Sequence, residues 1–172
     1  MTRRQVISTP ATPPGSVPRY FDRSYDDSRH DPYQAKGKYR EPTACRRCGA
    51  IFEGGRWHWG EAAANASHSI CPACARIRDD LPAGYVSLSG AFFSAHRDDL
   101  MRLVWNTAAQ ERTEHPLHRI MHVVEAPDRT VVTTSDVHCA RRIGEALKRA
   151  YDGQLDMSFA HDEYSVRVSW RR

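Results

Sequence analysis

The pattern of hydrophobic and polar positions divides the chain into a region with regular periodicity and a region without it. From residue 84 onward, apolar residues recur either at every second position or at helical spacing. Helical spacing predicts one helix from a cap at Ser94 to about residue 114. It predicts a second helix that begins after the caps at residues 134–136 and ends at Gly153. Alternation predicts strands over residues 85–89, 117–125, 129–134, 155–160 and 164–170.

This order of elements, β-α-β-β-α-β-β, predicts an α+β domain over residues 84–172. It matches a ferredoxin-like sandwich, in which split βαβ units form one sheet, with an extra strand at the chain end. The chain has 172 residues, of which 40% are hydrophobic, so it is long enough for such a domain and a smaller module.

Residues 1–44 lack any period of 2 or 3.6 and hold six of the ten prolines. Such a stretch buries too little surface to offset its loss of conformational entropy, so we expect a disordered arm. It is basic and aromatic, with eight Lys or Arg residues against five acids, and the whole chain has a net charge of +4. Arginine and tyrosine suit phosphate pairing and base stacking. The alternative is a solvated linker without a partner.

Two cysteine pairs stand out in residues 45–83. Cys45 and Cys48 form one CxxC motif, Cys71 and Cys74 form another, and 22 residues separate them. Two such turns supply the four soft ligands of a tetrahedral zinc ion. Gly54-Gly55 between them indicates a hairpin, and a short helix is expected over residues 75–81. The segment is therefore predicted to be a zinc ribbon, or a treble-clef-like pair of knuckles.

Several neighbouring side chains bear on this site. Nearby arginines are expected to offset the negative charge of a tetrathiolate, and these are Arg46, Arg47, Arg76 and Arg78. His58 and His68 lie between the pairs, so either is an alternative ligand. A closed four-cysteine site leaves no coordination position for water, which argues against catalysis by this ion.

Other enzymatic interpretations find little support. A zinc deaminase needs HxE upstream of PCxxC, whereas the HxE at residues 161–163 lies far downstream of the cysteines. Cys139 follows His138 directly, and helix neighbours point about 100° apart, so the two cannot form a nucleophile–base pair. Cys139 is therefore expected to be a packing residue, and His118 and His122 to be structural. We predict that the protein is not an enzyme.

Basic residues gather on the second helix and on the last strand. Arg141, Arg142, Lys148 and Arg149 lie opposite the apolar face of the predicted helix, and Arg167 and Arg171 occupy alternate positions of the strand. Phosphate contacts from these residues would give salt-dependent binding with little sequence preference. The alternative is an ordinary solvated surface.

Several stretches resemble an uncharacterised bacterial zinc-ribbon family. They include Asp31-Pro-Tyr33, Cys45-x-x-Cys48-Gly49-Ala50, Gly55-Arg-Trp57, Cys71-Pro-Ala-Cys74, Gly84-Tyr-Val86, His115-Pro-Leu117, Arg119-Ile-Met121, Thr133-Thr134-Ser-Asp136-x-His138 and residues 140–147. The zinc segment is also similar to the nonsense-mediated decay protein family, the export adaptor of the large ribosomal subunit. This second resemblance covers about 50 residues, and the chain lacks that family's second cysteine cluster. It implies zinc binding and contact with ribosomal or other structured RNA.

The sequence thus predicts a zinc-binding protein that associates with RNA or a ribosomal particle. The alternative is a protein–protein adaptor, in which Trp57, Trp59 and the arm aromatics bind a protein partner. No run of apolar residues reaches the roughly 18 needed to cross a bilayer, and the N-terminus has no apolar signal region. We therefore expect a cytoplasmic location without a membrane partner.

Overall fold

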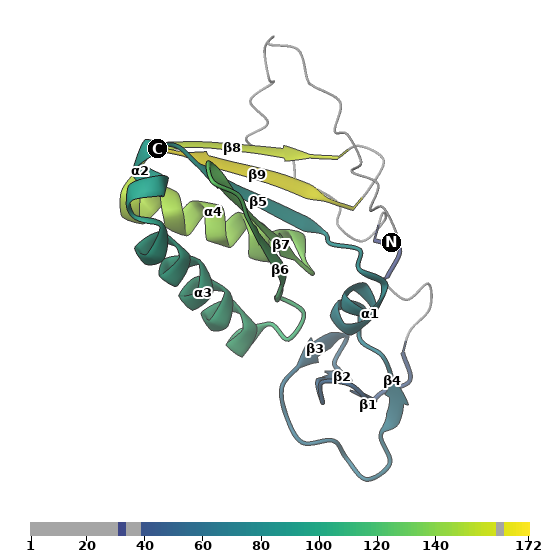
Figure 1. Cartoon of the computed structure of the whole chain (residues 1–172). Helices are drawn as coiled ribbons and strands as arrows, with labels where there is room; N and C mark the ends of the chain where they lie inside the picture. Colours follow the sequence, from purple (N-terminus) through teal and green to yellow (C-terminus); the bar gives the residue numbers. More distant parts are fainter. Residues whose placement is uncertain (1–30, 34–38, 161–163) are drawn as a thin grey trace, which may run out of the picture.

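The computed structural model describes residues 31–33, 39–160 and 164–172 and has a mixed α+β fold with two sheets and four helices (Figure 1). Most of the predicted arm, including Tyr20, Phe21 and Tyr25, lies outside the described residues. Part of that arm packs against the cysteine segment, because the ring of Tyr39 contacts the rings of Phe52 and Trp57. No helix within the described ranges is long and apolar enough to cross a bilayer.

The smaller sheet holds the cysteine segment. Its strands are β1 (Thr43–Cys45), β2 (Ile51–Glu53), β3 (Arg56–His58) and β4 (Ser67–Ser69), in the order β3-β2-β1-β4. Gly54 and Gly55 have φ of 61° and 76°. Positive φ at both positions suits a two-residue hairpin turn, and this confirms the predicted hairpin between β2 and β3. The helix α1 (Pro72–Asp79) begins three residues before the predicted start, because Cys71 caps its N-terminus.

The larger sheet has five strands in the order β6-β7-β5-β9-β8. They are β5 (Gly84–Ser89), β6 (Ile120–Glu125), β7 (Arg129–Thr134), β8 (Gln154–Phe159) and β9 (Val166–Arg171). All five predicted strands are present, although β6 begins three residues later than expected. The last strand pairs parallel to β5 and antiparallel to β8, so it lies inside the sheet rather than at an edge. The finer assignment to a ferredoxin-like sandwich stays a prediction.

Three helices cover one face of this sheet (Figure 1). They are α2 (Ala91–Ala95), α3 (Arg97–Glu114) and α4 (Val137–Tyr151). The prediction of a single helix capped by Ser94 was wrong, because His96 separates α2 from α3 and Ser94 lies within α2. The predicted cap of the later helix is confirmed, since the carboxylate of Asp136 accepts hydrogen bonds from the backbone N–H groups of His138 and Cys139.

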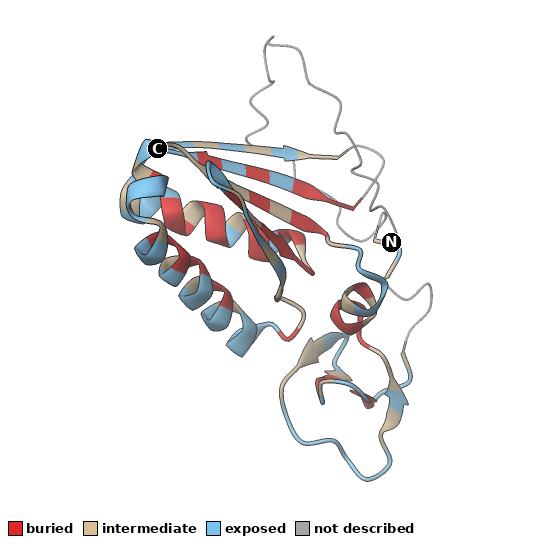
Figure 2. Ribbon diagram, in the orientation of Figure 1, coloured by how far each residue is buried: buried red, intermediate tan, exposed pale blue. Residues whose placement is uncertain are grey.

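The core lies between these helices and the sheet (Figure 2). Alternate residues of β5 and β9 are fully or almost fully buried, and they include Val86, Leu88, Val166, Val168 and Trp170. Cys139 is also fully buried, which fits its predicted packing role. The intervening residues of the same strands point to the opposite face, where Arg167, Ser169 and Arg171 are exposed. None of the described helices covers that opposite face.

Candidate metal centre

The fold of the small sheet brings the two cysteine pairs together. Cys45 ends β1, and the turn that follows it closes through hydrogen bonds from Gly49 N–H to the Cys45 carbonyl and from Cys45 N–H to the Ala50 carbonyl. Strand β4 pairs parallel to β1, with Ser69 opposite Cys45. Cys71 follows two residues later at the cap of α1, and Cys74 lies in the first turn of that helix. The parallel pairing of β1 and β4 therefore brings the second CxxC motif next to the first.

The four thiol groups are spaced as ligands of one metal ion. Their Sγ atoms all lie within 4.8 Å of one another, and the Sγ atoms of Cys48 and Cys71 are 3.7 Å apart. A tetrahedral ion with metal–sulfur bonds of about 2.3 Å needs sulfur atoms about 3.8 Å apart. The predicted approach of the first knuckle to the second is confirmed. His58 and His68 belong to neither of the candidate metal-binding groups found among the described residues.

Backbone N–H groups also point at the sulfur atoms. The N–H of Cys71 donates to Cys45 Sγ at 3.3 Å, and the N–H of Cys74 donates to Cys71 Sγ at 3.4 Å. Burial opposes ionisation of Cys45, but backbone hydrogen bonds outweigh it and lower the pKa of this thiol to about 6. Burial raises the pKa of Cys71 and of Cys74 above the ordinary value. A cation at the cluster would favour the thiolate form of all four.

A cationic side chain from the segment between α3 and β6 contacts the cysteine cluster. Arg119, which is buried and precedes β6, donates from Nη1 to Cys74 Sγ at 3.3 Å. Its Nη2 is buried without a hydrogen-bond partner. Burial opposes the charge of Arg119, but the thiol groups of Cys48 and Cys74 outweigh it and raise its pKa. A buried guanidinium fits beside a cluster that becomes negatively charged when four thiolates bind a divalent ion.

Three of the four arginines expected to offset this charge have other contacts. Arg76 forms an ion pair with Asp31 at 2.5 Å, and Arg78 pairs with Asp79 at 2.6 Å. Arg47 donates to the Cys74 carbonyl at 3.4 Å rather than to a sulfur atom. Sequence reasoning missed Arg119 because it lies 45 residues beyond Cys74 and no local pattern connects them.

The metal module also contacts the α+β domain through a tryptophan. The indole Nε1 of Trp59 donates to the carbonyl of Arg112 at 2.6 Å, near the C-terminal end of α3. Leu117, which lies in the segment between α3 and β6, also packs against the cysteine cluster. Because the last carbonyls of a helix lack partners within the helix, this hydrogen bond satisfies one of them and joins the two modules.

The six basic residues proposed from sequence do not share one surface. Four lie on α4, and three of these pair with acids: Arg141 with Glu145 at 3.4 Å, Arg142 with Glu111 at 3.7 Å, and Lys148 with Asp152 at 2.5 Å. Arg149 is exposed on the same helix. Arg167 and Arg171 lie on the sheet face opposite the helices. The helix residues and the strand residues therefore belong to separate surfaces, and nucleic-acid contact by either set stays a prediction.

The face of the large sheet away from the helices forms a second candidate surface, which we call the open face. Strand registers place its residues in rows: His122, Thr133, Tyr85, Arg167 and Ser158 in one; Val124, Val131, Ser87, Ser169 and Asp156 in the next; Arg129, Ser89, Arg171 and Gln154 in the third. The guanidinium of Arg167 lies 5.1 Å from the ring centroid of Tyr85. The first row borders the metal module, because His122 Nε2 lies 2.7 Å from Asp80 Oδ1.

Comparisons with models of protein families, with curated proteins and with solved structures found no match. The resemblance to the zinc-ribbon and decay-protein families therefore stays a prediction.

Proposed function

We propose that this protein is a non-enzymatic, zinc-binding RNA-binding protein, and that its open face contacts single-stranded segments of RNA, including those of a ribosomal particle. The observation that carries the proposal is the pairing of Tyr85 and Arg167 at 5.1 Å, on the adjacent inner strands β5 and β9 of a sheet face that no described helix covers. Aromatic rings on an uncovered sheet stack on unpaired bases, and arginine contacts phosphate or stacks on a base plane.

Zinc is the metal that suits the first site best. Four cysteine ligands, three of them buried, favour a soft or borderline ion in tetrahedral geometry. Such an ion stabilises a small module by roughly 10 kcal/mol or more. Since the sheet of this module has strands of only three residues, we assign zinc the role of holding it in place beside the first row of the open face.

The charge and size of the open-face residues support RNA as the partner. Arg129, Arg167 and Arg171 stand against one acid, Asp156, in the three rows. Between the cations lie the serines Ser87, Ser89, Ser158 and Ser169. Small hydroxyl side chains leave the backbone of the sheet accessible and offer hydrogen bonds to a base edge.

The helix surface predicted from sequence is a weaker candidate. Arg141, Arg142 and Lys148 have carboxylate neighbours within 4.0 Å, and those carboxylates would oppose the approach of phosphate. We retain α4 and the N-terminal arm as supplementary phosphate contacts. The main surface for the bases is the open face.

The experiment is the binding of a fluorescently labelled single-stranded RNA to the zinc-loaded protein over a series of salt concentrations. Tyr85→Ala and Arg167→Ala are each expected to weaken binding by about 5-fold to 150-fold, the usual cost of losing a base-stacking contact. The matched control is the pair Arg141→Ala and Arg149→Ala on α4, where Arg141 is half-buried and Arg149 is exposed, and for which we expect a smaller loss. Absence of binding at low salt, or loss confined to the α4 variants, would overturn the proposal.

A protein–protein adaptor is the second candidate function. The observation that favours it is an aromatic group in which Tyr39 packs on Phe52 and Trp57 of the β2–β3 hairpin, with ring centroids 4.9–5.5 Å apart. Affinity purification from cell lysate with and without RNase separates the two functions. Protein partners that are lost on RNase treatment support RNA binding. Partners that stay bound to the hairpin after RNase treatment support the adaptor.

A further inference from the structure

A cluster of histidines and carboxylates lies where α3 ends, apart from the four cysteines. Glu111 lies in the last turn of α3, and His115 is the residue that caps the helix, with its N–H donating to the Glu111 carbonyl at 2.8 Å. Pro116 follows the cap residue, and a turn closed by the His118 N–H and the His115 carbonyl at 3.0 Å returns His118 to the same place. One candidate ligand atom from each of these three side chains lies within 4.8 Å of the other two.

We propose that Glu111, His115 and His118 form a second metal site, which binds one borderline divalent transition ion such as Zn²⁺. The proposal goes beyond the proposed function and does not depend on RNA binding. Two imidazoles and one carboxylate are a ligand set that zinc accepts readily, and the set contains no sulfur.

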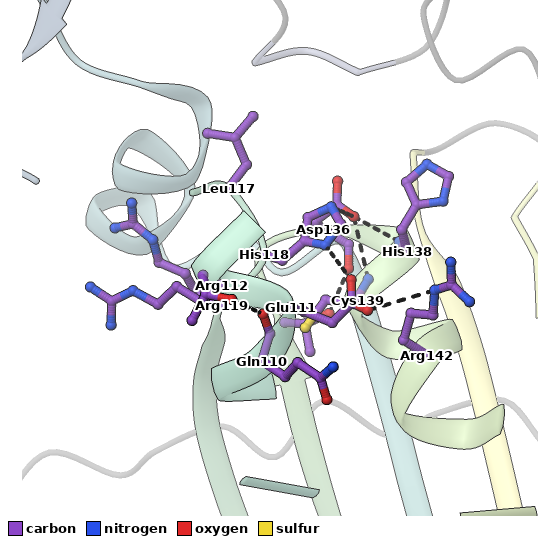
Figure 3. A network of polar contacts seen from close by, with 12 residues as sticks. Gln110, Glu111, Arg112, Leu117, His118, Arg119, Asp136, His138, Cys139 and Arg142 are labelled. Atoms are coloured by element: carbon purple, nitrogen blue, oxygen red, sulfur yellow. Dashed lines mark hydrogen bonds and ion pairs between the residues drawn. The ribbon is translucent and has the colours of Figure 1, made fainter. Parts of the chain in front are cut away.

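The surroundings of His118 orient it as a metal ligand. Its Nδ1 lies 3.0 Å from Glu111 Oε2, and its Nε2 lies 3.2 Å from Asp136 Oδ1 (Figure 3). Histidines that bind metals usually donate their second ring N–H to a carboxylate, which fixes the tautomer and the plane of the ring. Asp136 occupies that position, so Nδ1 is left to face the ion together with Glu111.

Both carboxylates are themselves held in place. Asp136 Oδ1 accepts the N–H of His138 at 2.7 Å and that of Cys139 at 3.4 Å, as the cap of α4. The guanidinium Nε of Arg142 lies 3.7 Å from Glu111 Oε1, the oxygen that does not face His118 (Figure 3). These contacts hold the two carboxylates in place and leave Glu111 Oε2 available to bind the ion.

Exposure distinguishes this site from the cysteine cluster. The side chains of Glu111 and His118 are 20% and 13% exposed, whereas His115 is an exposed residue. With three protein ligands and one exposed side, a tetrahedral ion would keep one position for water or for another ligand. The cysteine cluster supplies four ligands and has no such position.

The same contacts suit a second explanation, in which a protonated His118 bridges Glu111 and Asp136 without a metal. The number of metal ions bound decides between the two. The full chain is dialysed against buffered free Zn²⁺, and bound zinc is measured by elemental analysis and by native mass spectrometry. We expect two ions per wild-type chain and one per chain for His115→Ala and for Glu111→Gln.

The control is His122→Ala, which removes an exposed histidine that also contacts a carboxylate, Asp80; this variant should retain two ions. Cobalt substitution identifies each site, because only the cysteine cluster gives thiolate charge-transfer absorption. His115 is exposed, so its substitution should leave the fold intact, which far-UV circular dichroism checks. A wild-type chain that saturates at the cysteine cluster alone, or a second ion retained by both ligand variants, would overturn the proposal.

Discussion

The guanidinium of Arg119 lies 3.3 Å from the sulfur of Cys74, although the two residues belong to different modules. Cys74 lies in α1 beside the small sheet, and Arg119 precedes the first edge strand of the large sheet. The arginine Nε also donates to the Pro116 carbonyl at 2.8 Å, which fixes the direction of the side chain. The α+β domain thus supplies a positive charge to the cysteine cluster.

The first prediction concerns this arginine. Arg119→Met removes the positive charge beside the thiolates while keeping much of the apolar stem. Contacts of this kind around a metal site usually contribute about 10-fold to 100-fold in affinity. We therefore expect zinc affinity to fall by that factor, measured by competition with a chromophoric chelator.

Arg112→Met is the matched control for this measurement. The guanidinium groups of both arginines lie about equally far from the ring centroid of Trp59, at 5.8 Å for Arg112 and 6.0 Å for Arg119. The two arginines differ in that Arg119 Nη1 also donates to Cys74 Sγ, at 3.3 Å. Equal zinc affinities of the two variants would show that the sulfur contact has no part in metal binding.

The second prediction concerns the reactivity of the five cysteines. Burial, with smaller effects of Asp136 and Glu111, raises the pKa of Cys139 to about 12, so at pH 8 almost none of this residue is thiolate. We expect the zinc-loaded chain to resist alkylation, a strong chelator to release four reactive cysteines, and denaturant to release the fifth. Mass spectrometry of the alkylated chain counts the modified residues. In Cys139→Ala the denaturant step should add none, and modification of Cys139 in the native chain would contradict the assignment.

The third prediction concerns a glycine in the middle of α4. Gly→Ala within a helix ordinarily stabilises it by about 1 kcal/mol. At Gly144, however, an added Cβ would lie 2.6 Å from Val168 Cγ1 and 3.1 Å from Leu155 Cδ1. We expect Gly144→Ala to lower the free energy of unfolding by about 1–3 kcal/mol, the usual cost of overpacking.

Urea denaturation measures this change. Asn106→Ala, at an exposed position of α3, is the control and should be neutral or slightly stabilising. A Gly144→Ala chain that is more stable than wild type would contradict the close approach of α4 to Val168 of β9.

The fourth prediction concerns the hydrogen bond between the modules. Trp59→Phe keeps an aromatic ring but removes the N–H that donates to the Arg112 carbonyl at 2.6 Å. We expect a loss of about 0.5–1.5 kcal/mol in the free energy of unfolding. Trp57→Phe, two residues earlier on β3, is the control, since its ring packs on Phe52 and Tyr39. An equal loss in both variants would assign the effect to ring packing and not to the hydrogen bond.

Local sequence determined the elements and the composition of the metal site. Alternation predicted the strands because side chains of a strand point to opposite faces, and Asp136 marked the start of α4 because its carboxylate accepts from nearby N–H groups. The CxxC spacing identified all four members of the cysteine cluster, since each turn directs two thiols to one point. The break at His96 was not predicted, because no proline or glycine interrupts the helical pattern there.

Relationships between distant residues required the tertiary structure. Only the strand order places β9 between β5 and β8, and so sets Arg167 beside Tyr85 and apart from the basic residues of α4. Only the contact between modules brings Arg119 to Cys74, and only the turn after α3 places His118 between Glu111 and Asp136. Periodicity and caps act over a few residues and are visible in the sequence. Pairing and packing bring together residues that the chain separates, and no local pattern records them.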